Sequence, residues 1–270
     1  MKNNPFLNKY YKNSSLHNRE IDLILCHVLD INTAGLFIYN KTISADEDYL
    51  INDLCNKRSQ GLPFAYITGK KSFWTLDLKV NQHTLIPRPE TEMLVELVLQ
   101  KTDANFKGRV LDLGTGTGAI ALSIATERPF AKISAIDFSY ECIKVAKFNK
   151  KQHSIKNVQV FQSDWFDNVG QDKFDIIVSN PPYIDENDAH LINLKYEPDT
   201  ALTAKKNGFA DLIHIIENAK KHLQKNGIIM LEHGYNQHTR VQQYLSQNNY
   251  KNVKTHNDLA GIPRITTAEF

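Results

Sequence analysis

The chain has 270 residues, of which 41% are apolar and 23% are charged, and its formal net charge is +2. This length and apolar content suffice for a large domain with a smaller one, and the composition excludes a largely disordered chain. The near-neutral charge neither requires nor excludes a nucleic-acid partner. No stretch approaches the roughly 18 apolar residues of a membrane span, and the opening residues lack the apolar segment of a secretory signal, so we expect no membrane partner.

The cysteines and histidines argue against a metal site. Cys26, Cys55 and Cys142 are far apart and form no C-x-x-C pair. This use of cysteine is typical of a reducing compartment, so we expect a cytoplasmic protein without a disulfide framework. The ten histidines are scattered, and they lack the paired spacing of metal ligands. We therefore predict no bound metal.

The first 70 residues predict a small all-α domain. Apolar residues recur at helical spacing between Ile21 and Leu29, which indicates a helix with one buried face. A second helix is predicted to begin after Ser44, a good N-cap that is followed by acidic residues, and to end near Gly61. This domain contains no pattern of residues that is typical of catalysis.

A β-hairpin is predicted at residues 71–86, between the helical domain and the rest of the chain. Apolar and polar residues alternate from Leu76 to Val80, which is the pattern of a half-buried strand. Residues 81–83 are suited to a turn, and residues 84–87 are suited to a returning strand.

From residue 87 onward, strands and helices alternate. Pro89 is expected at the first position of a helix, with acidic residues in its first turn. This alternation predicts an α/β domain with a mostly parallel sheet and helices on both faces, in which ligands bind at the carboxyl ends of the strands. Strands are predicted at 109–114, 132–137, 158–162, 174–180, 227–234, 252–259 and 264–270, and helices at 89–101, 118–129, 139–152 and 209–224. The last two strands are expected to pair antiparallel.

A glycine-rich loop follows the first strand of this domain. Gly114, Gly116 and Gly118 form G-x-G-x-G, whereas a dinucleotide site has G-x-G-x-x-G and a phosphate-binding loop has a lysine. Glycine allows a tight turn and close approach of a ligand, and the start of the following helix attracts an anion. We predict that residues 114–118, which include Thr115 and Thr117, bind an amino-acid carboxylate, and that Asp112 holds its ammonium group.

Acidic and aromatic residues follow the next two strands. Asp137 ends the second strand, where a carboxylate can bind both hydroxyls of a ribose. After the third strand, Asp164 is suited to accept a hydrogen bond from an exocyclic amine, and Trp165 to stack on a purine. Carboxylate, ammonium, ribose and adenine together predict S-adenosylmethionine as cofactor. The alternatives are a simple tight turn at the glycines, a helix cap at Asp137 and a core position at Trp165.

Asn180, Pro181, Pro182 and Tyr183 follow the fourth strand, which is expected beside the glycine loop. The Asn180 side-chain oxygen and the Pro181 carbonyl oxygen can accept both N–H protons of a planar amide or aromatic amine. The nitrogen's lone pair would then face the donated methyl group, with Pro182 stiffening the turn and Tyr183 packing on the planar group. The alternative is a rigid turn without chemistry.

Six stretches together resemble the release-factor glutamine N5-methyltransferases, the HemK/PrmC family. Three of them carry the predicted site, and three are typical of this family rather than of methyltransferases in general. The stretches are DLGTGTGAIALSIA, QSDWF and IVSNPPYI, and GLPFAYITGKKSFW, LIPRPETE and YEPDTAL. The resemblance runs from about residue 19 to the C-terminus.

The resemblance implies a class I S-adenosylmethionine-dependent methyltransferase domain (Rossmann-like, with a mostly parallel seven-stranded sheet) at 87–270. It also implies a helical substrate-recognition domain at 1–70, joined by the hairpin at 71–86. The implied reaction methylates the glutamine of the Gly-Gly-Gln motif in peptide-chain release factors and leaves S-adenosylhomocysteine. The implied cofactor contacts are Gly114 to Gly118, Asp137, Trp165 and Asn180, and the implied substrate contacts are Asn180, Pro181, Pro182 and Tyr183.

Two further residues lie in family-typical stretches. Arg88 has two interpretations, a role at the active site or a surface ion pair with Glu90 or Glu92. Glu197 follows a polar loop at 184–196, which is either a lid or a plain connection.

The main rival function is an adenine-N6 methyltransferase that acts on DNA or RNA, because it uses the same chemistry. It should have a target-recognition domain or a basic and aromatic surface for base flipping. The basic residues near the start of this chain are followed by acidic ones from Asp46 to Asp53, so we expect no direct nucleic-acid partner. A cofactor-binding scaffold without catalysis is disfavoured because the Asn-Pro-Pro-Tyr motif is intact.

Overall fold

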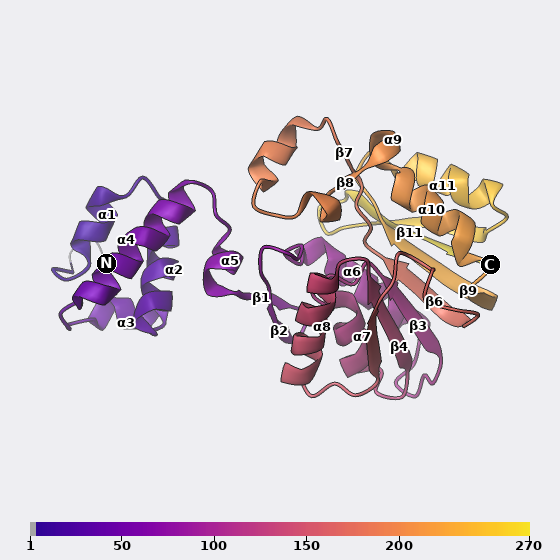
Figure 1. The fold of residues 1–270 in the computed structure, drawn as a ribbon, viewed down its shortest axis with the longest axis horizontal. Coiled ribbons are helices and arrows are strands. Elements are labelled where there is room, and N and C mark those ends of the chain that lie inside the picture. The colour runs from indigo at the N-terminus through magenta and orange to yellow at the C-terminus, as the bar shows by residue number, and fades with distance from the viewer. Residues whose placement is uncertain (1–3) are drawn as a thin grey trace. The chain divides into compact units, whose positions relative to one another are not determined.

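The computed structural model describes residues 4–270, which divide into two compact units at Gly69 and Lys70 (Figure 1). In the described chain, no helix is both long and apolar enough to cross a membrane. Each unit has its own hydrophobic core, so each is described separately.

The N-terminal unit is a helical bundle, as predicted. Its core contains Ile21, Ile24 and Leu25 from α2 and Ile51 and Leu54 from α4. The helices are α1 (Asn8–Asn13), α2 (Asn18–Leu29), α3 (Thr33–Ile38), α4 (Ala45–Ser59) and α5 (Phe64–Thr68). The predicted cap of α4 is confirmed, because the Ser44 hydroxyl accepts from the Glu47 backbone N–H while the Glu47 carboxylate accepts from the Ser44 N–H. This reciprocal pair satisfies two N–H groups that the helix itself cannot satisfy.

The second unit opens with a hairpin that lies earlier in the sequence than predicted. β1 (Lys70–Phe73) pairs antiparallel with β2 (Leu76–Lys79), and the chain turns at Trp74, whose φ is 54°. The prediction of a returning strand at 84–87 was wrong. Pro87 has no N–H to donate, and the backbone N–H of Ile86 is bound by the Glu197 carboxylate at 3.0 Å.

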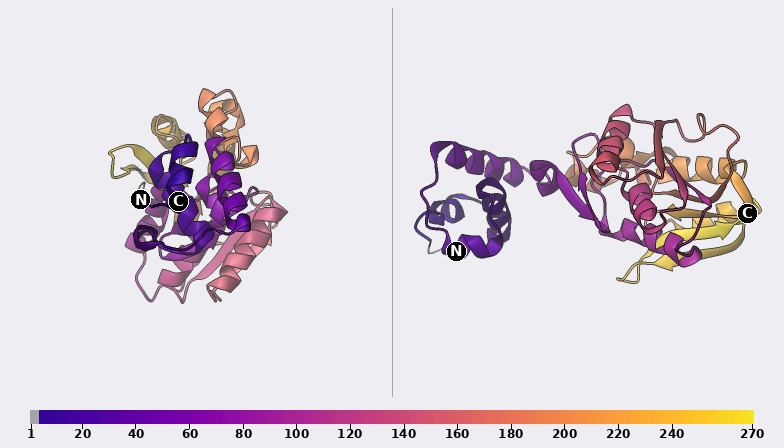
Figure 2. Two further views of the ribbon diagram at one scale, coloured as in Figure 1. Left: turned by 90° about the vertical axis from the view of Figure 1, so that its left-hand side faces the viewer. Right: turned by 90° about the horizontal axis from the view of Figure 1, so that it is seen from below.

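The central sheet confirms the predicted fold class. Within residues 4–270 it has seven strands in the order β10-β11-β9-β6-β3-β4-β5. Adjacent strands from β5 to β9 are parallel, while β11 is antiparallel to both of its neighbours, at the sheet edge that Figure 2 shows in yellow. The strands are β3 (Arg109–Leu113), β4 (Lys132–Asp137), β5 (Val158–Gln162), β6 (Phe174–Ser179), β9 (Leu223–Glu232), β10 (Lys251–Asn257) and β11 (Pro263–Glu269).

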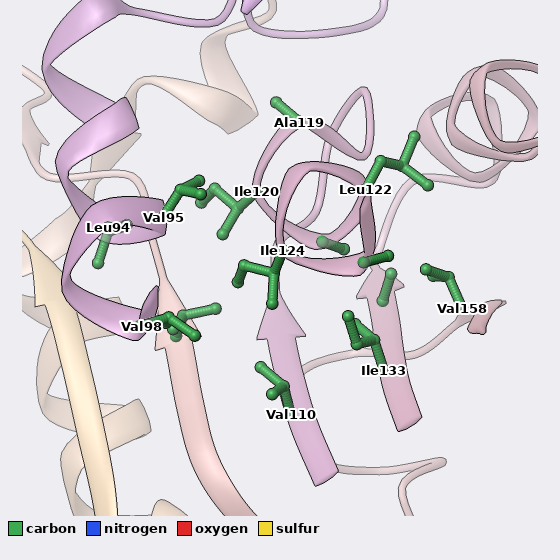
Figure 3. Close-up of a cluster of buried hydrophobic side chains, with 14 of the residues drawn as sticks. Leu94, Val95, Val98, Val110, Ala119, Ile120, Leu122, Ile124, Ile133 and Val158 are labelled. Carbon is green, nitrogen blue, oxygen red and sulfur yellow. The ribbon is translucent and has the colours of Figure 1, made fainter. Parts of the chain in front are cut away.

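Helices cover both faces of this sheet because side chains alternate along the buried strands. Val110 and Ile176 pack with the first group of helices, whereas the next residues, Leu111 and Ile177, pack with the second group. Figure 3 shows part of the first core, where α6 and α7 lie over β3 and β4. The first group is α6 (Glu92–Lys101, preceded by the 3₁₀ turn η1, Pro89–Thr91), α7 (Ala119–Glu127) and α8 (Tyr140–Gln152), and the second is α10 (Ala210–Ala219) and α11 (His238–Gln247).

The predicted boundary between α10 and β9 was wrong, and α11 was not predicted. β9 begins at Leu223, four residues before the predicted strand, because Leu223 pairs with Phe174 ahead of a register shift. α11 has an apolar face of little more than Val241 and Leu245, which is too weak a pattern to identify from the sequence.

Residues 184–208 consist of short elements that connect β6 to α10. They are β7 (Ile184–Asp185), η2 (Ala189–Leu194), η3 (Asp199–Ala201), β8 (Thr203–Ala204) and α9 (Lys205–Gly208). β7 and β8 pair parallel in a separate small sheet. We call this segment the strap.

The carboxyl ends of β3, β4, β5 and β6 are tied to one another. The N–H of Thr115 donates to the carbonyl of Ile136 at 2.8 Å, and the N–H of Ser163 donates to that of Asp137 at 3.0 Å. The Ser179 hydroxyl donates to the carbonyl of Leu113 at 2.8 Å. The segments that carry the predicted site residues therefore meet at one edge of the sheet.

Candidate active site

The glycine loop joins β3 to α7 with three left-handed residues. Gly114, Gly116 and Gly118 have φ values of 71°, 55° and 85°. Residues with a Cβ adopt such left-handed angles only at a cost in free energy. A Cβ at Gly118 would lie 2.9 Å from the Leu122 side chain, so this glycine allows helix packing. A Cβ at Gly116 would meet no atom of the described chain within 4 Å. The loop therefore leaves open space beside Gly116.

Asp112 lies behind this loop and is fully buried. Its Oδ2 accepts from the Thr115 hydroxyl at 2.6 Å and from the Ala121 N–H at 3.2 Å, while Oδ1 has no hydrogen-bond partner among the residues described. Burial raises the pKa of this carboxyl to about 7, and the two hydrogen bonds oppose part of that rise. An unpartnered buried carboxylate oxygen fits a cationic group, although Asp112 is not among the residues that line the pocket in front of the loop.

Thr115 and Thr117, the other members of the loop, make hydrogen bonds that support it. Both are buried. The Thr115 hydroxyl is held by Asp112, and the carbonyl of Thr117 accepts from the Asn149 side chain at 2.9 Å.

A pocket of about 120 Å³ lies in front of the loop. Six residues predicted from the sequence line it: Gly114, Gly116, Asp137, Trp165, Asn180 and Pro182. Sequence reasoning missed the others that complete it, among them His83 and Leu85 from the segment after the hairpin, and Phe138, which follows Asp137. The segments after β3, β4 and β5 and the Asn180 turn after β6 thus line one cavity, which we call the first pocket.

Asp137 is oriented by backbone groups on both sides. Its Oδ2 accepts from the Gly116 N–H and its Oδ1 from the Ser139 N–H, each at 2.8 Å. Burial raises its pKa, and these hydrogen bonds oppose the rise. Each oxygen has a further lone pair that can accept from a ligand hydroxyl.

The structure separates Trp165 from its neighbour Asp164. Trp165 lines the first pocket with its backbone at a φ of 40°. Asp164 is exposed and lies outside the pocket lining, where Ser163 stands instead. The prediction that Asp164 contacts the cofactor therefore has no support from the geometry. The left-handed backbone at Trp165 redirects the chain here, and sequence alone does not reveal that turn.

A second pocket, of about 260 Å³, adjoins the first and shares Asn180, Leu85 and Ala201 with it. Pro181, Tyr183 and Arg88 line the second pocket, and Ile184, Leu194 and Leu202 close it from the strap. Asn180 stands at the boundary, so a group bound in one pocket and a group bound in the other meet at its side chain.

Two buried residues hold the Asn180–Tyr183 turn from behind. The Asn180 Nδ2 donates to the Thr91 hydroxyl at 3.1 Å, and the Tyr183 hydroxyl donates to Glu232 Oε1 at 3.4 Å. Burial raises the pKa of Glu232 to about 7 and raises the pKa of Tyr183 as well. Sequence reasoning missed Thr91 and Glu232, although Glu232 lies within a predicted strand and ends the observed β9.

The backbone of the same turn rests against Gly208. A Cβ at Gly208 would lie 2.1 Å from the carbonyl oxygen of Tyr183, and the φ of Gly208 is 80°. The buried Gln237 side chain donates to the carbonyls of Tyr183 and Gly208 at 3.0 and 3.3 Å. These contacts were not predictable, since they join residues far apart in the chain.

Arg88 pairs with Glu197 rather than with Glu90 or Glu92, so the surface-pair interpretation was wrong. The Arg88 guanidinium lies 2.5 Å from Glu197 Oε1, and Glu197 is only 6% exposed. Glu197 Oε2 accepts from the Ile86 N–H at 3.0 Å. Glu197 therefore ties the strap to the segment before η1 and holds Arg88 at the second pocket.

In residues 4–270, no group of three or more His, Cys, Asp or Glu side chains is placed to hold a metal ion.

Comparisons with known proteins agree with this arrangement. A family model for a methyltransferase domain matches residues 105–265, and a model for the PrmC N-terminal domain matches residues 10–69. The chain is 45% identical over 252 residues to a release factor glutamine methyltransferase of Aliivibrio fischeri, covering 92% of this chain and 88% of that one. It is 40% identical over 255 residues to the enzyme of that name from Escherichia coli, with 93% and 92% coverage.

Among solved structures, the chain is similar to a methyltransferase from Pyrococcus furiosus. The TM-score is 0.57 at 21% identity, and the match covers 80% of this chain and 98% of that one. This likeness concerns the fold, and it agrees with the predicted class I methyltransferase sheet.

Proposed function

The chain belongs to the family of release factor glutamine methyltransferases, and we propose that it methylates the side-chain amide nitrogen (N5) of the glutamine in the Gly-Gly-Gln motif of peptide-chain release factors. The relatives that are 40–45% identical over more than 90% of the chain carry that name. The observation that carries the proposal is the position of Asn180, which lines both adjoining pockets. One pocket suits a methyl donor, and the other suits a planar amide.

The proposed donor is S-adenosylmethionine, which supplies a methyl group on a sulfonium and leaves as S-adenosylhomocysteine. Residues of the first pocket fit it. Open space beside Gly116 and the N–H groups at the start of α7 suit its carboxylate. The unpartnered Oδ1 of Asp112 suits its ammonium group, and Asp137 suits the ribose hydroxyls. Trp165 and Phe138 supply apolar surface for the adenine.

An amide nitrogen is a poor nucleophile because its lone pair is delocalised into the carbonyl group. Asn180 Oδ1 and the Pro181 carbonyl would each accept one of its N–H protons, which fixes the nitrogen with its lone pair toward the first pocket. The same two oxygens stabilise the positive charge that develops on nitrogen during transfer. Tyr183 packs on the amide plane. No base is needed before attack, and the surplus proton leaves afterwards.

We also propose that the N-terminal unit recognises the release factor and that residues after the hairpin form the catalytic domain. We propose that the reaction takes place in the cytoplasm, and the free thiols of Cys26, Cys55 and Cys142 in the described chain support this proposal. Arg88, held by Glu197 at the second pocket, would contact the substrate loop near its glutamine.

The test combines purified protein, S-adenosylmethionine and an unmethylated release factor, followed by peptide mass spectrometry. One methyl group on the Gly-Gly-Gln glutamine is expected with the wild type and is largely lost in Asn180→Ala. Asn105→Ala, in an exposed loop, serves as the matched control and should keep full activity. An unmodified glutamine together with methylated adenine in DNA or RNA would replace this function by the adenine-N6 one.

A further inference from the structure

The buried side chain of Gln237 joins three separate segments beside the second pocket. Gln237 precedes α11 and is 5% exposed. Its Oε1 accepts from the Gly234 N–H at 2.8 Å, and its Nε2 donates to the carbonyls of Tyr183 at 3.0 Å and Gly208 at 3.3 Å. We propose that Gln237 is a positioning residue, which clamps the two ends of the strap together and so holds the wall of the second pocket in place for the substrate. Its effect on the reaction rests on the proposed function, whereas the clamp itself does not.

The three hydrogen bonds of Gln237 determine which way its amide group faces. An amide oxygen can only accept, and an amide NH₂ group can only donate. The Gly234 N–H requires an acceptor, while the carbonyls of Tyr183 and Gly208 require a donor. If the amide were turned over, like groups would oppose each other at all three positions. A carboxylate at position 237 would satisfy only Gly234 and would place a negative charge against two carbonyl oxygens.

The clamp lies where the strap leaves the catalytic turn and where it returns to the sheet domain. Tyr183 directly precedes β7, and Gly208 is the last residue of α9. Beside the clamp, the Ile184 N–H donates to the Leu202 carbonyl at 3.0 Å, and β7 pairs with β8. Ile184 and Leu202 line the second pocket together with Leu194 and Tyr183. The clamp therefore determines where the apolar wall of the pocket stands relative to Tyr183.

The returning end of the strap has a backbone conformation that requires such support. Lys206, Asn207 and Gly208 have φ values of 56°, 57° and 80°. This left-handed conformation is unfavourable for a residue with a Cβ, and above all for Lys206. Strained conformations persist only where the surrounding contacts determine them. The hydrogen bond from Gln237 to the Gly208 carbonyl is such a contact, so its loss should let this segment relax away from Tyr183.

The middle of the strap is held separately from its ends. Glu197 binds the Ile86 N–H and pairs with Arg88. Loss of the clamp should therefore loosen the ends without releasing the whole strap. Three strap residues that line the first pocket follow this anchor within a few positions, so the affinity for S-adenosylmethionine should change little. They are Pro198, Thr200 and Ala201.

The kinetic test uses Gln237→Glu, which keeps the shape of the side chain but lacks its NH₂ group. The KM for an unmethylated release factor should rise roughly tenfold, because two buried carbonyls lose their donor and the pocket wall shifts. The kcat should fall less, since the wall contacts the substrate before and during transfer alike. Gln237→Met has a similar length without the charge and should also raise this KM. A KM within twofold of the wild type in both variants would overturn the proposal.

Asn157→Asp is the matched control, because it removes an amide NH₂ group that serves backbone carbonyls far from the pockets. Asn157 directly precedes β5, at the amino ends of the parallel strands. Its Nδ2 donates to the carbonyls of Ala125, Arg128 and Ala131 at 3.3, 3.1 and 3.2 Å. The substitution should lower the melting temperature without changing KM. If it raised KM as much as Gln237→Glu, loss of stability alone would explain the effect, and the positioning role would be rejected.

Hydrogen exchange without substrate separates this inference from the proposed function. The Ile184 N–H should exchange about tenfold faster or more in Gln237→Glu and Gln237→Met than in the wild type, because local opening at the strap ends becomes easier. Asn157→Asp should leave this exchange rate unchanged. An unchanged rate at Ile184 in both Gln237 variants refutes the clamp, whatever the substrate. Faster exchange in a protein that leaves release-factor glutamine unmodified would support the clamp and reject the proposed reaction.

Discussion

Gly208 allows the strongest test of how the Asn180–Tyr183 turn is held, because it contacts neither pocket. Replacing it with alanine has two separate effects. Its φ of 80° lies in the left-handed region, where a Cβ costs about 1–2 kcal/mol. In addition, the new Cβ would lie 2.1 Å from the carbonyl oxygen of Tyr183.

The second effect moves the catalytic turn. Cβ atoms in proteins are essentially never closer than 3.0 Å to such an atom, so the turn and Gly208 must separate by about 0.9 Å, the difference between 3.0 and 2.1 Å. A misplacement of about 1 Å in a positioned site costs roughly a hundredfold in rate. We therefore expect kcat of Gly208→Ala to fall about a hundredfold, or ~2.7 kcal/mol of transition-state stabilisation.

Gly261→Ala separates strain from displacement. Gly261 has a φ of 79°, but a Cβ there meets no described atom within 4 Å. Urea unfolding should show a loss of about 1–2 kcal/mol in Gly261→Ala and a larger loss in Gly208→Ala, whose Cβ also clashes with the turn. Methyl transfer to a release factor at saturating S-adenosylmethionine should fall only in Gly208→Ala. If its kcat stayed within twofold of that of Gly261→Ala, the turn would not be held by this contact.

Three further substitutions test the roles of single polar groups. Asn180→Ala should fold and bind S-adenosylmethionine but lose roughly a hundredfold in kcat, and near-normal turnover would remove Asn180 from the reaction. Asp137→Ala should weaken S-adenosylmethionine binding in calorimetry more than it slows the saturated reaction, because a ribose contact is the same in ground and transition states; the reverse pattern would contradict it. Burial raises the pKa of Asp112 to about 7, so the free protein carries a proton there at pH 6. Binding of an ammonium group lowers that pKa and should release up to about one proton. Calorimetry in buffers of different ionisation enthalpy measures this release, and an equal release by Asp112→Asn would exclude Asp112 as its source.

The parts of the site that follow strand ends were predictable from the sequence. Gly114, Asp137 and Asn180 each come directly after a buried apolar run, and parallel strands bring such positions to one edge of the sheet. The three residues do line one pocket. The hairpin was misplaced because alternation identifies a strand but not its partner. Residues 70–73 carry little apolar alternation, and they are the strand that pairs with 76–79.

The supporting residues were not predictable, because their roles depend on contacts between distant parts of the chain. Thr91 and Asn180 are 89 residues apart, and Arg88 and Glu197 are 109 residues apart. In the sequence, Thr91 is one polar residue at a helix start, and nothing local indicates that its hydroxyl meets the amide of Asn180, which follows β6. Asp164 differs from these residues, since its position after β5 predicts a cofactor contact, whereas in the structure it is exposed and outside the lining of the first pocket.

Three neighbouring strands each lead to one residue of the site or of its support. The positions of these residues relative to one another therefore depend on how the buried strands pair. β3 leads into Gly114, β6 into Asn180, and β9 ends in Glu232, with β6 in the middle. The register pairs Leu113 with Ser179 and Ser179 with Leu231, so the three groups follow paired positions of adjacent strands. A one-residue slip of β6 would exchange the faces of its side chains and separate Asn180 from both neighbours. Core substitutions that loosen this register, far from either pocket, should therefore impair catalysis before they unfold the domain.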